Sequence, residues 1–211
     1  MRLEVMLAEL GSLRTALGRG YQDALNDIFR PENATPGLVH QRIAELGVSA
    51  ILTTNYDPLI EELQETPRRH PYTWRESDLA LNDLKKGRRV LFKIHGTAER
   101  HDTVVLTESE YDRVRSDKSY QGVLRHLLQE YTVLFLGYGM NDPLDLDLVL
   151  RWNAEVFKPA ARRHYALLKD ASGTDSDRYL REYNVQVMDY SKHEDLPAIL
   201  EALRHAGLST E

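Results

Sequence analysis

Five short apolar runs, each followed by a helix-like pattern, constrain the fold of this 211-residue chain more than any other feature. They show little polar alternation, as is typical of strands that are buried on both faces. The runs are VSAILTT (48–54), VLFKI (90–94), TVLFLG (132–137), HYALL (164–168) and VQVMDY (185–190). Strands that alternate with helices at this spacing need crossover connections, which produce a mostly parallel sheet. We therefore predict an α/β fold with helices on both faces of the sheet.

The segments around these runs show the spacing of amphipathic helices. An N-terminal helix is predicted over 2–17, where apolar residues recur at helical intervals before Gly18-Arg19-Gly20 ends the pattern. Further helices are predicted over 21–29, 38–46, 76–86, 108–116, 119–130, 143–156, 174–183 and 194–207. No internal repeat or linker interrupts the chain, so we predict a single domain over 1–211 whose N-terminal part, 1–37, is helical.

Composition excludes several classes of protein. The chain has no cysteine, which rules out disulfides, thiolate zinc sites and a cysteine nucleophile. Its net charge of −6 argues against direct nucleic-acid binding, which favours a basic surface. No apolar run approaches the roughly 20 residues of a membrane span. The first residues are too acidic and too periodic for a signal peptide. We expect a cytoplasmic protein that does not engage a membrane.

Polar residues follow three of the five predicted strands. Ligands of open parallel sheets bind beyond the carboxyl ends of the strands, so these residues are candidates for a site. Asp57-Pro58 and Asp142-Pro143 are equally well explained as helix N-caps followed by proline. Asn55 has no such capping duty, and His95 precedes a glycine that permits close approach of a ligand or another backbone. The segments are Thr53-Thr54-Asn55-Tyr56-Asp57, His95-Gly96 and Gly137-Tyr138-Gly139-Met140-Asn141-Asp142.

Known local motifs do not account for these residues. Gly137 and Gly139 begin like a dinucleotide fingerprint, but position 142 is Asp and not the third glycine. The acidic residues that follow lack the spacing and the terminal Glu of a calcium loop. No histidine lies in an HExxH arrangement. We therefore expect no metal site.

Read in order, five segments resemble the sirtuin-like (silent information regulator) superfamily. The likeness is greatest to its bacterial branch that consumes NAD in antiphage defence, and it covers about residues 38–203. It implies a Rossmann-like sheet. The segments are LVHQRIAELGVSAILTTNYDPLIEEL (38–63), VLFKIHGT (90–97), VVLTESEYDRV (104–114), VLFLGYGMNDPLDLDLVL (133–150) and YNVQVMDYSKHEDLPAILEAL (183–203).

The resemblance also implies site residues and a substrate, NAD. Asn55 would hold the nicotinamide ribose or the attacking water, Asp57 would line the nicotinamide side, and His95 would act as general base on the ribose hydroxyls. The stretch Gly137 to Gly139 would approach the adenosine half. The NAD-binding residues implied are Thr53, Thr54, Tyr56, Gly96, Gly137, Tyr138, Gly139, Asn141 and Asp142.

Two departures from the family pattern affect the expected activity. Sirtuin deacylases usually carry a zinc module with four cysteines, so the absence of cysteine favours NAD hydrolysis over deacylation. The family also begins with a strand and a Gly-Ala-Gly-x-Ser loop that binds the NAD pyrophosphate through backbone N–H groups. Nothing before residue 48 has that pattern. We expect this first strand and loop to be missing, and the affinity for NAD to be weakened.

Three functions follow as alternatives. The first is an NAD+ glycohydrolase of antiphage defence that releases nicotinamide and ADP-ribose. The second is a non-catalytic sirtuin-like remnant that binds ADP-ribose-type ligands or mediates assembly. The third is an NAD-dependent deacylase without a zinc module. For each we expect a homo-oligomer and, in defence, a partner protein or an additional domain.

Overall fold

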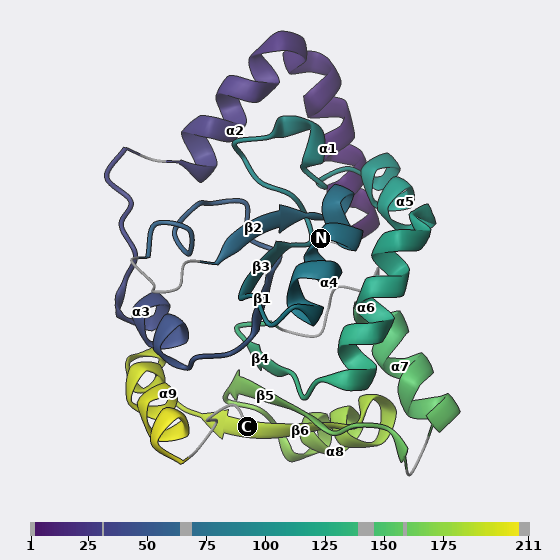
Figure 1. Ribbon diagram of the computed structural model, residues 1–211. Coiled ribbons are helices and arrows are strands. Elements are labelled where there is room, and N and C mark those ends of the chain that lie inside the picture. Colours follow the sequence, from purple (N-terminus) through teal and green to yellow (C-terminus); the bar gives the residue numbers. More distant parts are fainter. Residues whose placement is uncertain (1–2, 31, 64–68, 139–145, 158–159, 207–211) are drawn as a thin grey trace. The chain divides into compact units, whose positions relative to one another are not determined.

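The computed structural model describes residues 3–30, 32–63, 69–138, 146–157 and 160–206, and Figure 1 traces them in sequence order. Contacts between residues divide the chain into two compact units. The first unit comprises residues 1–120 and 199–211, and the second comprises residues 121–198.

A three-stranded parallel sheet forms the centre of the first unit. Strand β3 (Val90–Lys93) lies between β1 (Ala50–Thr53) and β2 (His70–Thr73). Lys93, the last residue of β3, pairs with Thr53 on one side and with Thr73 on the other. All four residues of β3 are buried, as expected for a central strand covered on both faces.

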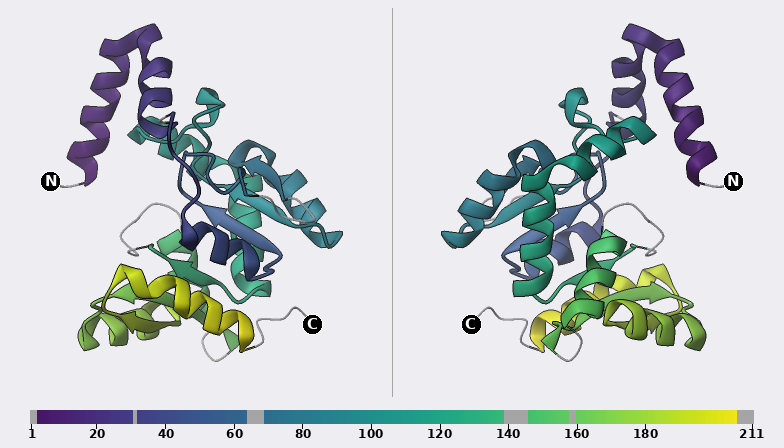
Figure 2. Two further views of the ribbon diagram at one scale, coloured as in Figure 1. Left: turned by 90° about the vertical axis from the view of Figure 1, so that its left-hand side faces the viewer. Right: turned by 90° about the vertical axis from the view of Figure 1, so that its right-hand side faces the viewer.

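The first unit also contains helices and short turns. In Figure 2, α1 and α2 lie side by side as a helical hairpin. Gly18, with φ +50°, ends α1 in a conformation that favours glycine. The helices are α1 (Leu3–Leu17), α2 (Tyr21–Phe29), α3 (Leu38–Glu45), α4 (Ser77–Lys85) and α5 (Glu108–Ser116), with 3₁₀ turns at Gly18–Gly20, Trp74–Glu76 and His101–Thr103.

The second unit contains another three-stranded parallel sheet. Strand β5 (His164–Lys169) lies between β4 (Leu134–Leu136) and β6 (Val185–Tyr190). The helices of this part of the chain are α6 (Lys118–Glu130), α7 (Leu146–Phe157), α8 (Gly173–Tyr183) and α9 (Leu196–His205), with a 3₁₀ turn at His193–Asp195; α6 begins in the first unit and α9 ends there. Ser172 accepts a hydrogen bond from the Asp175 N–H at the start of α8, which is an N-cap.

The α/β class, the parallel pairing and all five predicted strands are confirmed. Strand β2 was missed, because His70-Pro71-Tyr72-Thr73 has no apolar run and contains a proline. Proline is tolerated there because β2 pairs on one side only within the described sheet. The expected helix after Asp57 is wrong for residues 57–63, which form turns closed by a bond from the Glu62 N–H to the Pro58 carbonyl.

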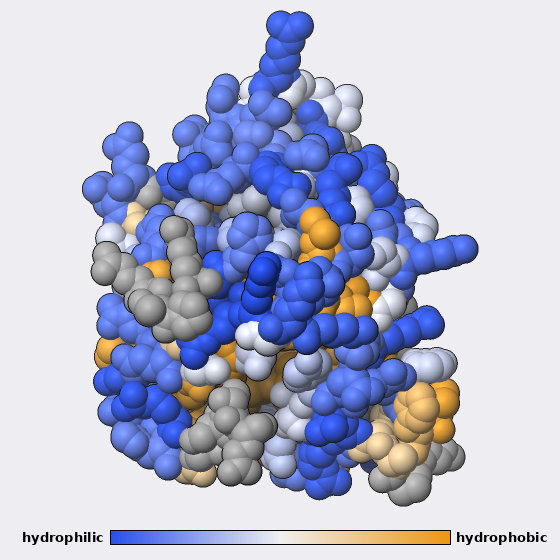
Figure 3. Space-filling model, in the orientation of Figure 1, coloured by the Kyte–Doolittle hydropathy of each residue, from blue (hydrophilic) through white to orange (hydrophobic). Residues whose placement is uncertain are grey.

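The surface agrees with the charge-rich composition. Most of the face shown in Figure 3 is hydrophilic, with a few smaller apolar areas. Within the described part of the chain, no helix combines the length and the apolar character that crossing a membrane requires.

Candidate functional site

The two candidate residues Asn55 and His95 follow neighbouring strands at equal distance. Thr53 and Lys93 are partners in the register of β1 and β3, and each candidate lies two residues further along its strand. A hydrogen bond of 3.0 Å from the Ile94 N–H to the Thr53 carbonyl continues the pairing beyond the last register pair. Because the strands are parallel, both residues lie at the same edge of the sheet, as predicted.

Side chains shape the turn that carries Asn55. The Asn55 N–H donates to the Thr53 hydroxyl at 3.1 Å, so this threonine closes the turn after β1. The Leu59 N–H donates to the Asp57 carboxylate at 3.1 Å, the contact expected of a capping aspartate. Asn55 itself is exposed, whereas Thr54 and Asp57 are half-buried. The amide of Asn55 is therefore accessible to a ligand.

Tyr56 ties this turn to the segment after β3. Its hydroxyl donates to the Val105 carbonyl at 2.6 Å, and its ring lies 4.8 Å from that of Phe29. Its own carbonyl accepts a hydrogen bond from the Ala98 N–H at 3.0 Å. The structure thus shows an anchoring role for Tyr56, while its contact with NAD stays a prediction.

His95 lies in a buried turn. The residue is 4% exposed, and its ring meets Tyr111 edge-on with the centroids 5.3 Å apart. Gly96 has φ +85°, and a Cβ there would lie 2.1 Å from the Thr103 carbonyl oxygen. Only glycine satisfies both conditions. Gly96 is therefore needed for close backbone packing. From the sequence, this glycine could have served the approach of either a ligand or another backbone, and the structure shows the backbone.

Lys93 and Glu61 also belong to this site, although neither was predicted from the sequence. Lys93 is 1% exposed, and its ammonium donates to the Glu61 carboxylate at 2.7 Å and to the Asp57 carbonyl at 2.6 Å. The available signal was a lysine inside the apolar run VLFKI, a position at which an unpaired charge is costly. These two residues join the Asn55 turn to the strand that carries His95.

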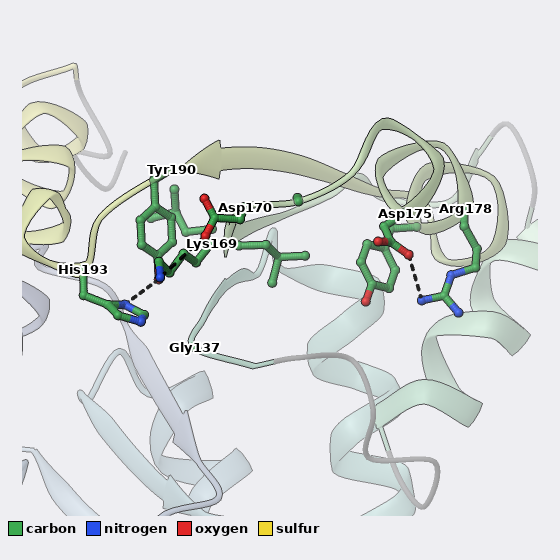
Figure 4. A pocket seen from close by; sticks show the side chains of 11 residues that line it. Gly137, Lys169, Asp170, Asp175, Arg178, Tyr190 and His193 are labelled. Carbon is green, nitrogen blue, oxygen red and sulfur yellow. Dashed lines mark hydrogen bonds and ion pairs between the residues drawn. The ribbon is translucent and has the colours of Figure 1, made fainter.

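The second unit contains a pocket of about 430 Å³ at the carboxyl ends of its strands (Figure 4). Gly137, which follows β4 with φ +61°, lines it. Its contact with a ligand stays a prediction. Tyr138 stacks on Phe135 with the ring centroids 5.7 Å apart. The predicted site residues Gly139, Asn141 and Asp142 lie outside the described residues.

Polar groups are spread along this pocket. Tyr190 and His193 lie at one end, joined by a 3.1 Å hydrogen bond between the tyrosine hydroxyl and Nδ1. Asp175 and Arg178 form an ion pair of 3.8 Å at the other end. None of these residues was predicted from the sequence, although Asp175 and Arg178 follow β5, and Tyr190 and His193 lie at and after the end of β6.

The described residues contain no cluster of three or more His, Cys, Asp or Glu side chains that would hold a metal ion. The polar contacts of the site are instead made by amide, hydroxyl, imidazole and ammonium groups and by single carboxylates.

Parallel strands with polar side chains at their carboxyl ends define a Rossmann-like α/β protein whose candidate ligand site lies at the strand ends. The family model of the SIR2-like domain matches residues 49–188, more than half of the chain. The protein belongs to the SIR2-like domain family.

Several bacterial proteins are similar to this chain. The NAD(+) hydrolase ThsA of Bacillus cereus is 28% identical over 184 residues, covering 83% of this chain and 38% of the relative. The NAD(+) hydrolase ThsA of Cytobacillus dafuensis is 27% identical over 188 residues, covering 78% of this chain and 38% of the relative. Defense-associated sirtuin 2 of Bacillus subtilis is 23% identical, covering 80% of this chain and 17% of the relative. The chain therefore spans well under half the length of these relatives.

Proposed function

We propose that this protein hydrolyses NAD+ in antiphage defence, breaking the bond between nicotinamide and ribose. The observation that carries the proposal is the placement of Asn55 and His95, two residues beyond a register pair of adjacent parallel strands. Membership of the SIR2-like family supports it. So does the similarity to proteins named as NAD(+) hydrolases and to one named as a defence-associated sirtuin.

The proposed chemistry needs few groups. When the nicotinamide leaves, the ribose develops oxocarbenium-like character, and water adds to the same carbon. Nicotinamide, ADP-ribose and one proton are the products. The exposed Asn55 amide orients the ribose or the water, and His95 accepts a proton as general base. Asp57 lines the nicotinamide side, with its carboxylate also held by the Leu59 N–H.

We propose a binding role for the pocket that Gly137 lines in the second unit. Its mixture of tyrosine, imidazole, carboxylate and guanidinium groups suits the hydroxyls and ring nitrogens of an adenosine moiety. Binding of adenosine monophosphate tests this role. Weaker binding to Tyr190→Phe or Asp170→Asn than to the wild type would support it. Equal binding by all three proteins would contradict it.

The direct test is to incubate the 211-residue protein with NAD+ and to measure the release of nicotinamide and ADP-ribose. We expect Asn55→Ala and His95→Ala each to lower kcat by at least about 100-fold, as the loss of a positioned general base or polar group does. His205→Gln, at an exposed position near the C-terminal end of α9, is the matched control and should retain activity. Full activity of both site variants would overturn the proposal.

Ligand binding without turnover is the second candidate. Residues 3–30 and 32–49 form helices and loops, so the described residues before β1 contain no strand followed by a phosphate-binding loop. Calorimetric binding of ADP-ribose, combined with no release of nicotinamide, would favour this candidate over hydrolysis.

We also propose that the protein acts in the cytoplasm as a homo-oligomer, together with a defence partner or an additional domain. Sedimentation velocity of the purified chain tests the oligomer directly. A single species at the mass of one chain, over the micromolar range, would refute that part.

A further inference from the structure

The buried ammonium of Lys93 is the feature of the first unit that most needs an explanation. The preceding residues of its strand, Val90, Leu91 and Phe92, are apolar and equally buried. Removing a charge from water is costly, and replacing a buried ion pair with apolar side chains is often neutral or stabilising. Stability alone therefore does not account for a lysine at this position.

Among the described residues, both side-chain hydrogen bonds of Lys93 lead to one segment. Its Nζ donates to the carbonyl of Asp57 and to the carboxylate of Glu61, at 2.6 Å and 2.7 Å. Both acceptors belong to the turns that follow β1, where residues 57–63 form no regular helix. A bond to the main chain of Asp57 constrains the backbone immediately after Asn55 and Tyr56.

Lys93 also belongs to the strand that leads to His95. It is the register partner of Thr53, from which the Asn55 turn begins. One side chain thus spans from the strand before His95 to the backbone beyond Asn55. Its ammonium is held by Asp57 and Glu61, so its effect on catalysis acts through these neighbours.

We propose that Lys93, paired with Glu61, is a positioning residue that holds the Asn55–Asp57 segment in register with His95. The inference rests on the proposed hydrolase function for its catalytic consequence. Small displacements of catalytic groups are expensive, since a shift of about 1 Å lowers rates on the order of 100-fold.

The decisive variant replaces both members of the pair, Lys93→Met with Glu61→Met. Because both members of the ion pair are removed together, neither leaves the other as a buried charge, and we expect the double variant to fold and to unfold near the wild-type denaturant midpoint. We expect kcat for NAD+ to fall about 10- to 100-fold while KM changes by less than about 3-fold. Lys85→Met, which removes an exposed lysine from the end of α4, is the matched control.

Amide hydrogen exchange gives a readout that needs no turnover. In the double variant, exchange over residues 55–62 should rise at least about 10-fold, while exchange over β3 stays unchanged. Should the double variant not fold, Glu61→Gln serves instead: it keeps Lys93 and its bond to Asp57, and it should raise exchange in the same segment to a smaller extent. Unchanged exchange in that variant would overturn the inference.

The outcomes separate this inference from the proposed function. Wild-type kcat combined with wild-type exchange in the folded double variant would overturn the role of Lys93 and leave the hydrolase intact. If the wild type releases no nicotinamide, the proposed function fails. The exchange of residues 55–62 then decides by itself whether Lys93 holds the segment.

Discussion

At the scale of single residues, the turn after β3 depends on Gly96. The backbone turns there with φ +85°, and the Thr103 carbonyl fills the space that a side chain would need. The same turn carries His95, whose carbonyl accepts a 3.0 Å bond from the Val105 N–H. Backbone packing of this kind fixes the path of the chain on both sides of the candidate base.

We expect Gly96→Ala to lower the free energy of unfolding by about 3 kcal/mol or more, because left-handed strain and a steric clash act together. Gly87→Ala is the control. It also has positive φ, +75°, but open space around its Cβ, so it should cost only about 1 kcal/mol. Urea unfolding of both variants measures the difference. Equal losses in the free energy of unfolding would show that the contact with Thr103 adds nothing to the cost.

At the scale of secondary-structure elements, one buried carboxylate organises the start of α5. Glu110 accepts hydrogen bonds from the Leu106 and Thr107 N–H groups at 2.9 Å and 2.8 Å, which satisfies two main-chain donors at the helix start. The same carboxylate pairs with Arg14 of α1. Glu110 thereby couples the N-terminal helix to the segment that follows the His95 turn.

The helix-start hydrogen bonds of Glu110 should contribute more to the free energy of unfolding than its ion pair with Arg14 does. Glu110→Ala leaves two N–H groups without their acceptor and should cost about 2 kcal/mol or more. Arg14→Met removes only a partly exposed ion pair and should cost less than about 1 kcal/mol. Chemical unfolding of the two variants tests this order, and a larger loss in Arg14→Met would assign the main role to the ion pair.

At the scale of the whole molecule, stability should depend on pH through a buried histidine of the second unit. Burial, reinforced by nearby Arg162, lowers the pKa of His164 from 6.5 to about 4. Its Nδ1 accepts a hydrogen bond from the Val133 N–H at 3.2 Å, which requires the neutral ring. The folded protein therefore binds this proton less readily than the unfolded chain.

The direction of the effect follows from that lowered pKa. The stabilisation that neutral His164 gives the folded protein is fully present above pH 6.5 and is lost as the pH falls from 6.5 towards 4. Between pH 7 and pH 5, the wild type should lose about 2 kcal/mol more than His164→Asn, which cannot be protonated in this range. Hydrogen exchange of the β5 amides at both pH values reports on this unit. If His164→Asn loses as much stability between pH 7 and pH 5 as the wild type does, the role of His164 is contradicted.

The sequence by itself determined the α/β class, the parallel strands and the edge of the sheet at which Asn55 and His95 lie. Apolar runs and helical periods are local properties, and parallel pairing then places the polar residues that follow β1 and β3 at one edge. It also determined the segments that mark the SIR2-like family. Only the tertiary structure decided that His70–Thr73 forms a strand, that Lys93 reaches Asp57 and Glu61, and that Gly96 packs against Thr103. Those features depend on residues distant in the chain, whose hydrogen bonds and steric contacts exist only once the strands have packed.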